Sequence, residues 1–218
     1  ATTEIYTLSL HDALPIFTLE NYANGWRGIG AFTFGKFFCN SFFLVILATI
    51  GTLLSSAIVA YGFSRCNFKC KGILFAAMLV TMMLPAQVLM IPQNLWYQKL
   101  GWVGTYLPLI VPFFFATQGF FTYMMKNFID GIPRKLDEAA VIRSCSYYGV
   151  FGRIILPLMV PALITGAIFS FMWRWDDFLS ALLYINSTEN YPVCLALKLF
   201  CDPSSSDRKS TRLNSSHT

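Results

Sequence analysis

The sequence predicts an all-α membrane protein, a polytopic helical bundle with four transmembrane spans present of an expected six. Three observations support this prediction. Of the 218 residues, 56% are hydrophobic and only 12% are charged, and the mean hydropathy is +0.55. Soluble domains carry about a quarter charged residues, so this chain has too little polar surface to coat a globule in water. Four long runs contain no charged residue, and the loops between them alternate in basic charge.

The two ends of the sequence differ from the rest. Segments 1–16 and 207–218 resemble translated sequencing adapters, with a natural polar tail at each end as the alternative, and we leave both out of the fold interpretation. The interpreted segment, taken as one transmembrane domain, is 17–206, and both histidines, His11 and His217, lie outside it. Histidine-based catalysis and histidine metal ligation are therefore not expected, and we expect the true protein to extend beyond both ends.

The four apolar runs are the predicted spans. They cover about 42–63, 72–92, 106–125 and 155–173. Each is close to the roughly 20 residues that cross a hydrocarbon core as a helix. Prolines occur within these runs, which a membrane bundle tolerates because neighbouring helices can satisfy the freed carbonyl groups.

The basic residues of the loops predict the orientation of the runs. Loop 64–71 carries three basic residues and no acid, loop 126–153 carries five basic residues, and loop 93–105 carries one. Because basic loops lie in the cytoplasm, we expect 64–71 and 126–153 inside and 93–105 outside. Segments 17–40 and 174–206 are then external, so we expect one further span on each side of the interpreted segment.

The predicted cytoplasmic loop 126–153 contains a predicted helix, about 133–145. A proline at its start suits the first helical position, and two acids in its first turn favour the positive end of the helix. Glu138 offers a carboxylate that could bind an arginine on another protein. Ala139 and Ala140 are small, so the helix can approach another surface closely. This helix is the candidate contact with a partner subunit.

The same loop carries the most specific motif of the chain. Glu138-Ala139-Ala140, followed by Ile154, Leu156 and Pro157, resembles the "EAA" loop of the permease subunits of binding-protein-dependent ABC importers. Further stretches resemble the carbohydrate-uptake branch of that family: 17–22, 40–41, 60–65, 85–92, 131–133 and 173–178. In that family the loop forms a coupling helix that docks on the ATPase subunit. The resemblance implies that the docking residues are Leu136, Glu138, Ala139, Ala140, Ser144, Ile154, Leu156 and Pro157.

The resemblance also implies partners and a location. They are a pair of ATPase subunits, a second permease subunit, an extracytoplasmic solute-binding protein and the lipid bilayer, with no nucleic acid. The expected location is the bacterial inner (plasma) membrane, with multiple spans, and the expected solute is a sugar or oligosaccharide. The chain lacks the phosphate-binding motif G-x-x-x-x-G-K-[ST], so no cofactor is expected in it, and ATP and Mg are expected in the partner ATPase.

One position departs from the family pattern. The family usually has Asp-Gly where this chain has Arg143-Ser144. Glycine permits a turn with positive φ that serine adopts only at a cost. The departure therefore concerns the geometry of the turn after the predicted coupling helix.

Other functions are less consistent with the residues. Cys66 and Cys70 lack a second Cys or His pair, so a zinc site is not expected. Asp176 and Asp177 are adjacent and do not face each other on a helix, so we expect helix-end acids and no catalytic residues. A channel or secondary transporter often carries charges within its spans, and these four runs have none. A permease of the same superfamily for a non-sugar solute remains an alternative.

Overall fold

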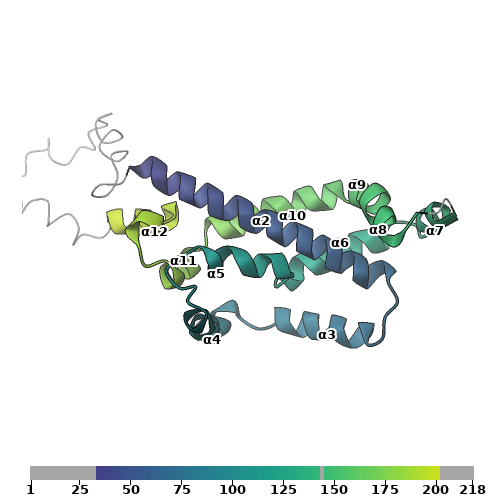
Figure 1. The fold of residues 1–218 in the computed structure, drawn as a ribbon, viewed down its shortest axis with the longest axis horizontal. Helices are drawn as coiled ribbons and strands as arrows, with labels where there is room; N and C mark the ends of the chain where they lie inside the picture. The colour runs from purple at the N-terminus through teal and green to yellow at the C-terminus, as the bar shows by residue number, and fades with distance from the viewer. Residues whose placement is uncertain (1–32, 143–144, 202–218) are drawn as a thin grey trace, which may run out of the picture.

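The computed structural model describes residues 33–142 and 145–201, and the regular elements within them are helices without any strand. The all-α prediction is therefore confirmed. In chain order the elements are α2 (Phe34–Arg65), α3 (Lys71–Met82), α4 (Ala86–Lys99), α5 (Leu107–Ile110), η1 (Val111–Phe115), α6 (Gly119–Asp130), α7 (Lys135–Ile142), α8 (Tyr147–Val150), η2 (Phe151–Ile155), α9 (Leu156–Leu158), α10 (Val160–Trp175), α11 (Phe178–Tyr184), η3 (Thr188–Asn190) and α12 (Val193–Cys201). Figure 1 shows them as an elongated bundle with α7 at one end and α12 at the other.

Helix α2 is the central element of the bundle. It is 32 residues long and packs against η1, α6 and α10. It begins eight residues before the predicted run 42–63 because polar residues continue it. Lys36 forms an ion pair with Glu189 at 2.5 Å, and Asn40 donates hydrogen bonds to the carbonyls of Glu189 and Tyr191 at 2.9 and 3.2 Å. These contacts attach the segment before α12 to the start of α2.

Within the described residues, two segments are long and apolar enough to cross a membrane by themselves, Phe34–Arg65 and Leu107–Asp130. Two bent pairs pass the same test when each is taken as one span. Lys71–Met82 and Ala86–Lys99 meet at 101°, and Tyr147–Leu158 and Val160–Trp175 meet at 72°. Each of the four apolar runs of the sequence falls largely within one of these segments.

The bends show where proline interrupts the apolar runs. The run 72–92 reads as one continuous segment, but α3 ends at Met82 and α4 begins after Pro85. Proline disfavours helical backbone at the residue before it and cannot donate to the preceding turn. Pro92 lies inside α4 without ending it. The second bend, at Met159, lies between two prolines, Pro157 and Pro161.

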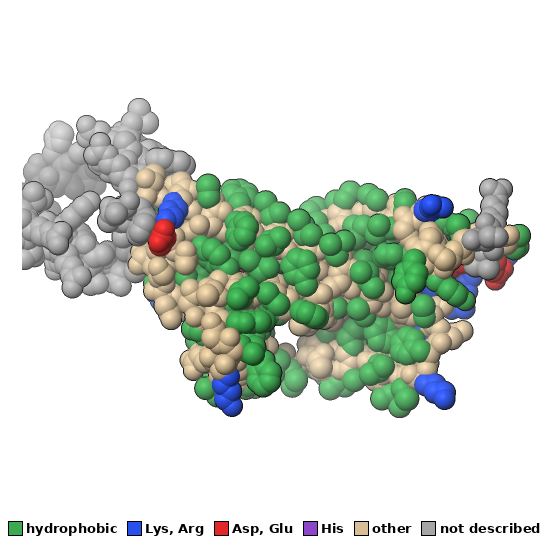
Figure 2. All heavy atoms as spheres, in the orientation of Figure 1, with side chains coloured by type: hydrophobic (Ala, Val, Ile, Leu, Met, Phe, Trp, Pro, Cys, Tyr) green, Lys and Arg blue, Asp and Glu red, His purple; other side chains and the backbone are tan. Residues whose placement is uncertain are grey.

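Small and hydroxyl side chains line the buried face of α2. Ala57, Ala60 and Ser56 are almost fully buried, and Ser170 of α10 donates a hydrogen bond to Thr49 at 3.3 Å. Small side chains let membrane helices pack closely, where van der Waals contact rather than exclusion of water holds them together. Large apolar side chains instead cover much of the outer surface, and Figure 2 shows them spread over one face of the bundle. A lipid environment accounts for this distribution.

Gly51 marks a close approach of η1 to α2. A Cβ atom added there would lie 2.6 Å from Cδ2 of Phe114, whereas a Cβ at Gly62 of the same helix would meet nothing within 4 Å. We expect Gly51→Ala to lower the melting temperature of the full-length protein in detergent, since overpacking costs about 1–3 kcal/mol. Gly62→Ala should leave it unchanged or raise it, because alanine favours the helix by about 1 kcal/mol. Equal melting temperatures for the two variants would contradict this packing.

Asp176 follows the end of α10, and Asp177 lies where α11 begins. Its Oδ1 accepts a hydrogen bond from the backbone N–H of Ser180 at 3.2 Å, which caps α11. Its other carboxylate oxygen lies 3.6 Å from Nη1 of Arg174. Asp177 is thus fully engaged in structural contacts.

Candidate functional site

Helix α7 is the central element of the candidate site. It lies at the end of the bundle where α2 and α6 also end (Figure 1). Its first turn is set by Pro133 and Arg134, whose carbonyls accept the backbone N–H groups of Leu136 and Asp137 at 3.2 and 3.0 Å. The helix runs from Lys135 to Ile142, within the predicted helix of about 133–145. Asp137 and Glu138 fall in the first turn, where the helix dipole favours negative charge.

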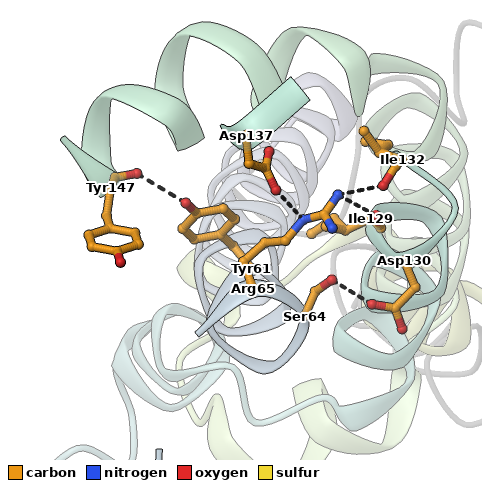
Figure 3. Close-up of polar contacts among 8 residues, drawn as sticks. All are labelled: Tyr61, Ser64, Arg65, Ile129, Asp130, Ile132, Asp137 and Tyr147. Atoms are coloured by element: carbon orange, nitrogen blue, oxygen red, sulfur yellow. Dashed lines mark hydrogen bonds and ion pairs between the residues drawn. The ribbon is translucent and has the colours of Figure 1, made fainter. Parts of the chain in front are cut away.

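The side chain of Arg65 joins α7 to the end of α2. Its Nε lies 2.9 Å from Oδ2 of Asp137, and its Nη2 donates to the carbonyls of Ile129 and Ile132 at 3.2 and 2.6 Å (Figure 3). The Nε–H does not point at the carboxylate oxygen, so this contact is an ion pair without a well-formed hydrogen bond. One guanidinium group at the end of α2 therefore contacts the last turn of α6, the turn after α6 and the first turn of α7. We call this set of contacts the Arg65 clamp.

Burial strengthens the Arg65 clamp. The side chains of Arg65 and Asp137 are only 6% and 19% exposed. Solvent screens a pair in this environment much less than a surface pair, and removing one partner leaves an uncompensated buried charge. Oδ1 of Asp137 is also buried and has no hydrogen-bond partner in the described residues. Loss of Arg65 would therefore leave an unpaired, mostly buried carboxylate on α7.

Three further contacts hold the same end together. Ser64 donates a hydrogen bond to Asp130 at 2.5 Å, and Lys126 pairs with the other oxygen of Asp130 at 2.5 Å. Tyr61 donates from its hydroxyl to the carbonyl of Tyr147 at 3.1 Å, which connects α2 to α8 (Figure 3). The end of α2 thus contacts α6, α7 and α8.

The structure separates the predicted docking residues into two groups. Leu136, Glu138, Ala139 and Pro157 are exposed. Ala140 is 6% exposed and packs in a core cluster, and Ile154 and Leu156 are half-buried. Ser144 lies outside the described residues. Of the two alanines, Ala140 therefore seats α7 closely against the bundle, while Ala139 faces outward beside Glu138.

Several residues of the site were not predicted as site residues. Arg65 and Asp137 form the clamp, but a single sequence gives no sign that they meet. Ile142, Tyr147 and Tyr148 are 84%, 71% and 90% exposed and add large apolar surface beside α7. The pair Tyr147-Tyr148, which follows the predicted helix closely in the sequence, was the one available signal for this apolar surface. Leu136, in the first turn of α7, is a further exposed apolar side chain.

The acidic and cysteine side chains near α7 do not gather into one cluster in the described part of the chain. Within the described residues, no three His, Cys, Asp or Glu side chains lie close enough together to hold a metal ion. Cys66 and Cys70 are free thiols, and Cys70 occupies a left-handed turn before α3. What the site presents is a firmly held short helix with an exposed carboxylate and apolar surroundings, which is suited to binding another protein.

Comparison with known proteins identifies the family of the chain. Residues 51–199 match the family model described as "Binding-protein-dependent transport system inner membrane component". A probable ABC transporter permease protein of Bacillus subtilis, YurM, is 33% identical over 189 residues, which are 86% of this chain and 61% of that protein. The alpha-glucoside transport system permease protein AglG of Rhizobium meliloti is 31% identical over 181 residues, which are 81% of this chain and 47% of that protein. The chain thus spans about half to three fifths of the length of these two relatives.

A solved structure shares the fold. It is a bacterial ABC transporter involved in the import of the acidic polysaccharide alginate. The TM-score is 0.70 at 23% sequence identity, over 76% of this chain and 57% of that chain. The match shows a common helical architecture for the described bundle.

Proposed function

Because the chain belongs to the family of binding-protein-dependent transport system inner membrane components, we propose that it forms part of the translocation path of an ATP-driven importer. We further propose that α7 is the surface on which a separate ATPase subunit docks. The observation that carries the proposal is the Arg65 clamp, which holds α7 against the ends of α2 and α6 while Glu138 and Ala139 remain exposed. A docking helix must be exposed to its partner and rigidly joined to the spans that it moves.

The Arg65 clamp offers a path by which movement of α7 can reach the membrane spans. A movement of α7 would pull on Arg65, and through Arg65 on α2, which packs along the length of the bundle. ATP-driven closure of a pair of ATPase subunits could thereby change the packing of the spans. The sequence has no phosphate-binding loop of the Walker type, which supports placing ATP and Mg in a partner subunit. A second permease subunit and an extracytoplasmic solute-binding protein complete the proposed importer.

We propose a sugar or oligosaccharide as the solute. Two relatives support this class by their names, the alpha-glucoside permease AglG and an arabinooligosaccharide transport system permease protein of Bacillus subtilis, AraQ, which is 30% identical. Another relative, from Synechocystis, is named for the uptake of osmoprotective compounds, so a non-sugar solute is the second candidate.

The proposal is tested by the energy source of transport. The full-length protein, assembled with its partner subunits in proteoliposomes, is expected to take up solute only when ATP is hydrolysed on the side of α7. The measurement is uptake of a radiolabelled saccharide with ATP, with a non-hydrolysable ATP analogue, and with an ion gradient alone. Uptake driven by the ion gradient without ATP would show a secondary transporter and overturn the proposal.

A further inference from the structure

A cavity of about 750 Å³ lies away from α7, towards the opposite end of the bundle. Parts of α3, α4, η1, α6, α10 and α11 line it, and it lies beside the 101° bend between α3 and α4. Figure 2 shows the surface hollowed in this region, below the middle of the bundle. Its volume falls within the roughly 300–1,000 Å³ of sites that bind small molecules.

Uncharged hydrogen-bonding groups occupy much of the wall. Three glutamines from different segments line it: Gln87 and Gln93 from α4, and Gln118 from the residue before α6. A primary amide both donates and accepts, as a sugar hydroxyl does, so the two kinds of group pair in either direction. Burial and the neighbouring Tyr97 and Asp177 raise the pKa of Tyr184, so its phenol also remains uncharged.

Aromatic rings form another part of the wall. Trp173 is 48% exposed and stands against Phe120 and Phe121, with ring centroids 5.1 and 5.5 Å away. Tyr97 and Tyr184 meet edge to face at 5.3 Å. Aromatic rings provide flat apolar area that packs well against the C–H face of a pyranose or furanose ring. A sugar ring has both a C–H face and hydroxyl groups, so a wall that combines aromatic rings with amides matches it.

The charges in the wall distinguish neutral from acidic sugars. Among the described residues that line the cavity, Arg174 is the one cation, and it is already engaged. Its guanidinium lies 3.5 Å over the ring of Phe113 and its Nη1 lies 3.6 Å from Asp177. Asp176 also lines the cavity and forms no ion pair within the described part of the chain. The wall therefore carries an excess of negative charge, which repels a carboxylate.

From these observations we infer that this cavity binds the solute and selects a neutral oligosaccharide over one built from uronic acids. The inference rests on the proposed importer function and names the class of its solute and this chain's share of the binding site. The glutamines hydrogen-bond the hydroxyl groups, Trp173 packs against a ring, and Asp176 disfavours an anionic sugar.

Protection of an introduced thiol tests the site. Gln93 and Gln98 are both exposed residues of α4, but only Gln93 lines the cavity. Gln93→Cys and Gln98→Cys are made in the full-length protein within its complex, and maleimide labelling at each position is followed by peptide mass spectrometry. Maltotriose or arabinotriose at ten times its Kd is expected to slow labelling of Gln93→Cys about tenfold. Labelling of Gln98→Cys should not change, and trigalacturonate should protect neither position.

Each outcome bears on the inference independently of the importer function. ATP-dependent uptake of a neutral saccharide without protection of Gln93→Cys would overturn the cavity and leave the importer standing. Protection without ATP-dependent uptake would support the cavity and reject the importer. Protection by trigalacturonate equal to that by maltotriose would overturn the selection of neutral sugars. In addition, Asp176→Asn is expected to raise the affinity for trigalacturonate severalfold, and an unchanged affinity would contradict the role of this carboxylate.

Discussion

Arg65→Ala is expected to uncouple ATP hydrolysis from solute uptake. The substitution leaves Asp137 as an unpaired, mostly buried carboxylate and frees the carbonyls of Ile129 and Ile132. Breaking a buried ion pair by removing one partner costs about 3–5 kcal/mol. Part of that cost can be avoided if α7 moves away from the bundle and exposes Asp137 to water. We therefore expect a lower melting temperature and a higher number of ATP molecules hydrolysed per solute transported.

Two control variants separate the clamp from general destabilisation. Arg65→Lys keeps the charge but lacks the planar fork that reaches the carboxylate and two carbonyls together, so an intermediate loss is expected. Asp137→Asn combined with Arg65→Ala should cost less than the sum of the two single changes, because the pair is then removed as a unit. Additive effects, or an unchanged ratio of ATP to solute in Arg65→Ala, would show that the clamp does not transmit movement.

Glu138→Lys is expected to abolish uptake by preventing the ATPase subunit from docking. Glu138 is exposed in the first turn of α7, so the folded bundle tolerates the change. A lysine there places a positive charge where a complementary cation of the partner is proposed. Losing one partner of a hydrogen-bonded charge pair in an interface costs about 2–5 kcal/mol, or roughly thirtyfold or more in affinity. The measurement is the rate of ATP-dependent saccharide uptake at equal amounts of complex in the membrane.

Matched variants define which property of Glu138 matters. Glu138→Gln keeps the size and loses the charge, so an intermediate uptake rate is expected. Arg153→Glu reverses an exposed charge in η2, outside α7, and should leave uptake near that of the unchanged protein. If Arg153→Glu were as damaging as Glu138→Lys, the effect would belong to the charge of the whole end of the bundle.

Much of the fold could be predicted because transmembrane spans are recognisable as long apolar runs. Inside the bilayer, the backbone N–H and C=O groups of a run of about 20 residues must hydrogen-bond to one another, and a single helix satisfies all of them. The exact helix ends were less predictable. Helix α2 extends back to Phe34 because Lys36 and Asn40 find partners near η3, 149 to 153 residues later in the chain. The break before Pro85 was obscured because proline inside an apolar run is compatible with either a kink or an end.

The candidate site was only partly predictable, because some of its contacts join residues far apart in the sequence. The position of α7 follows from local signals, a proline followed by two acids and two alanines. Which alanine faces inward depends on packing against Ile129 and Ile155, which no local pattern specifies. The Arg65 clamp joins residues 72 positions apart, and a basic residue at the end of an apolar run is read first as an orientation signal. Its second role needed the three-dimensional contacts.

The docking role of α7 is tested most directly by the ratio of ATPase subunit to this chain in the complex purified through a tag on this chain. We expect the ATPase subunit to co-purify with the unchanged protein and with Arg153→Glu, and to be largely lost from Glu138→Lys. A normal ratio in Glu138→Lys together with unchanged uptake would contradict the claim that α7 is the docking helix.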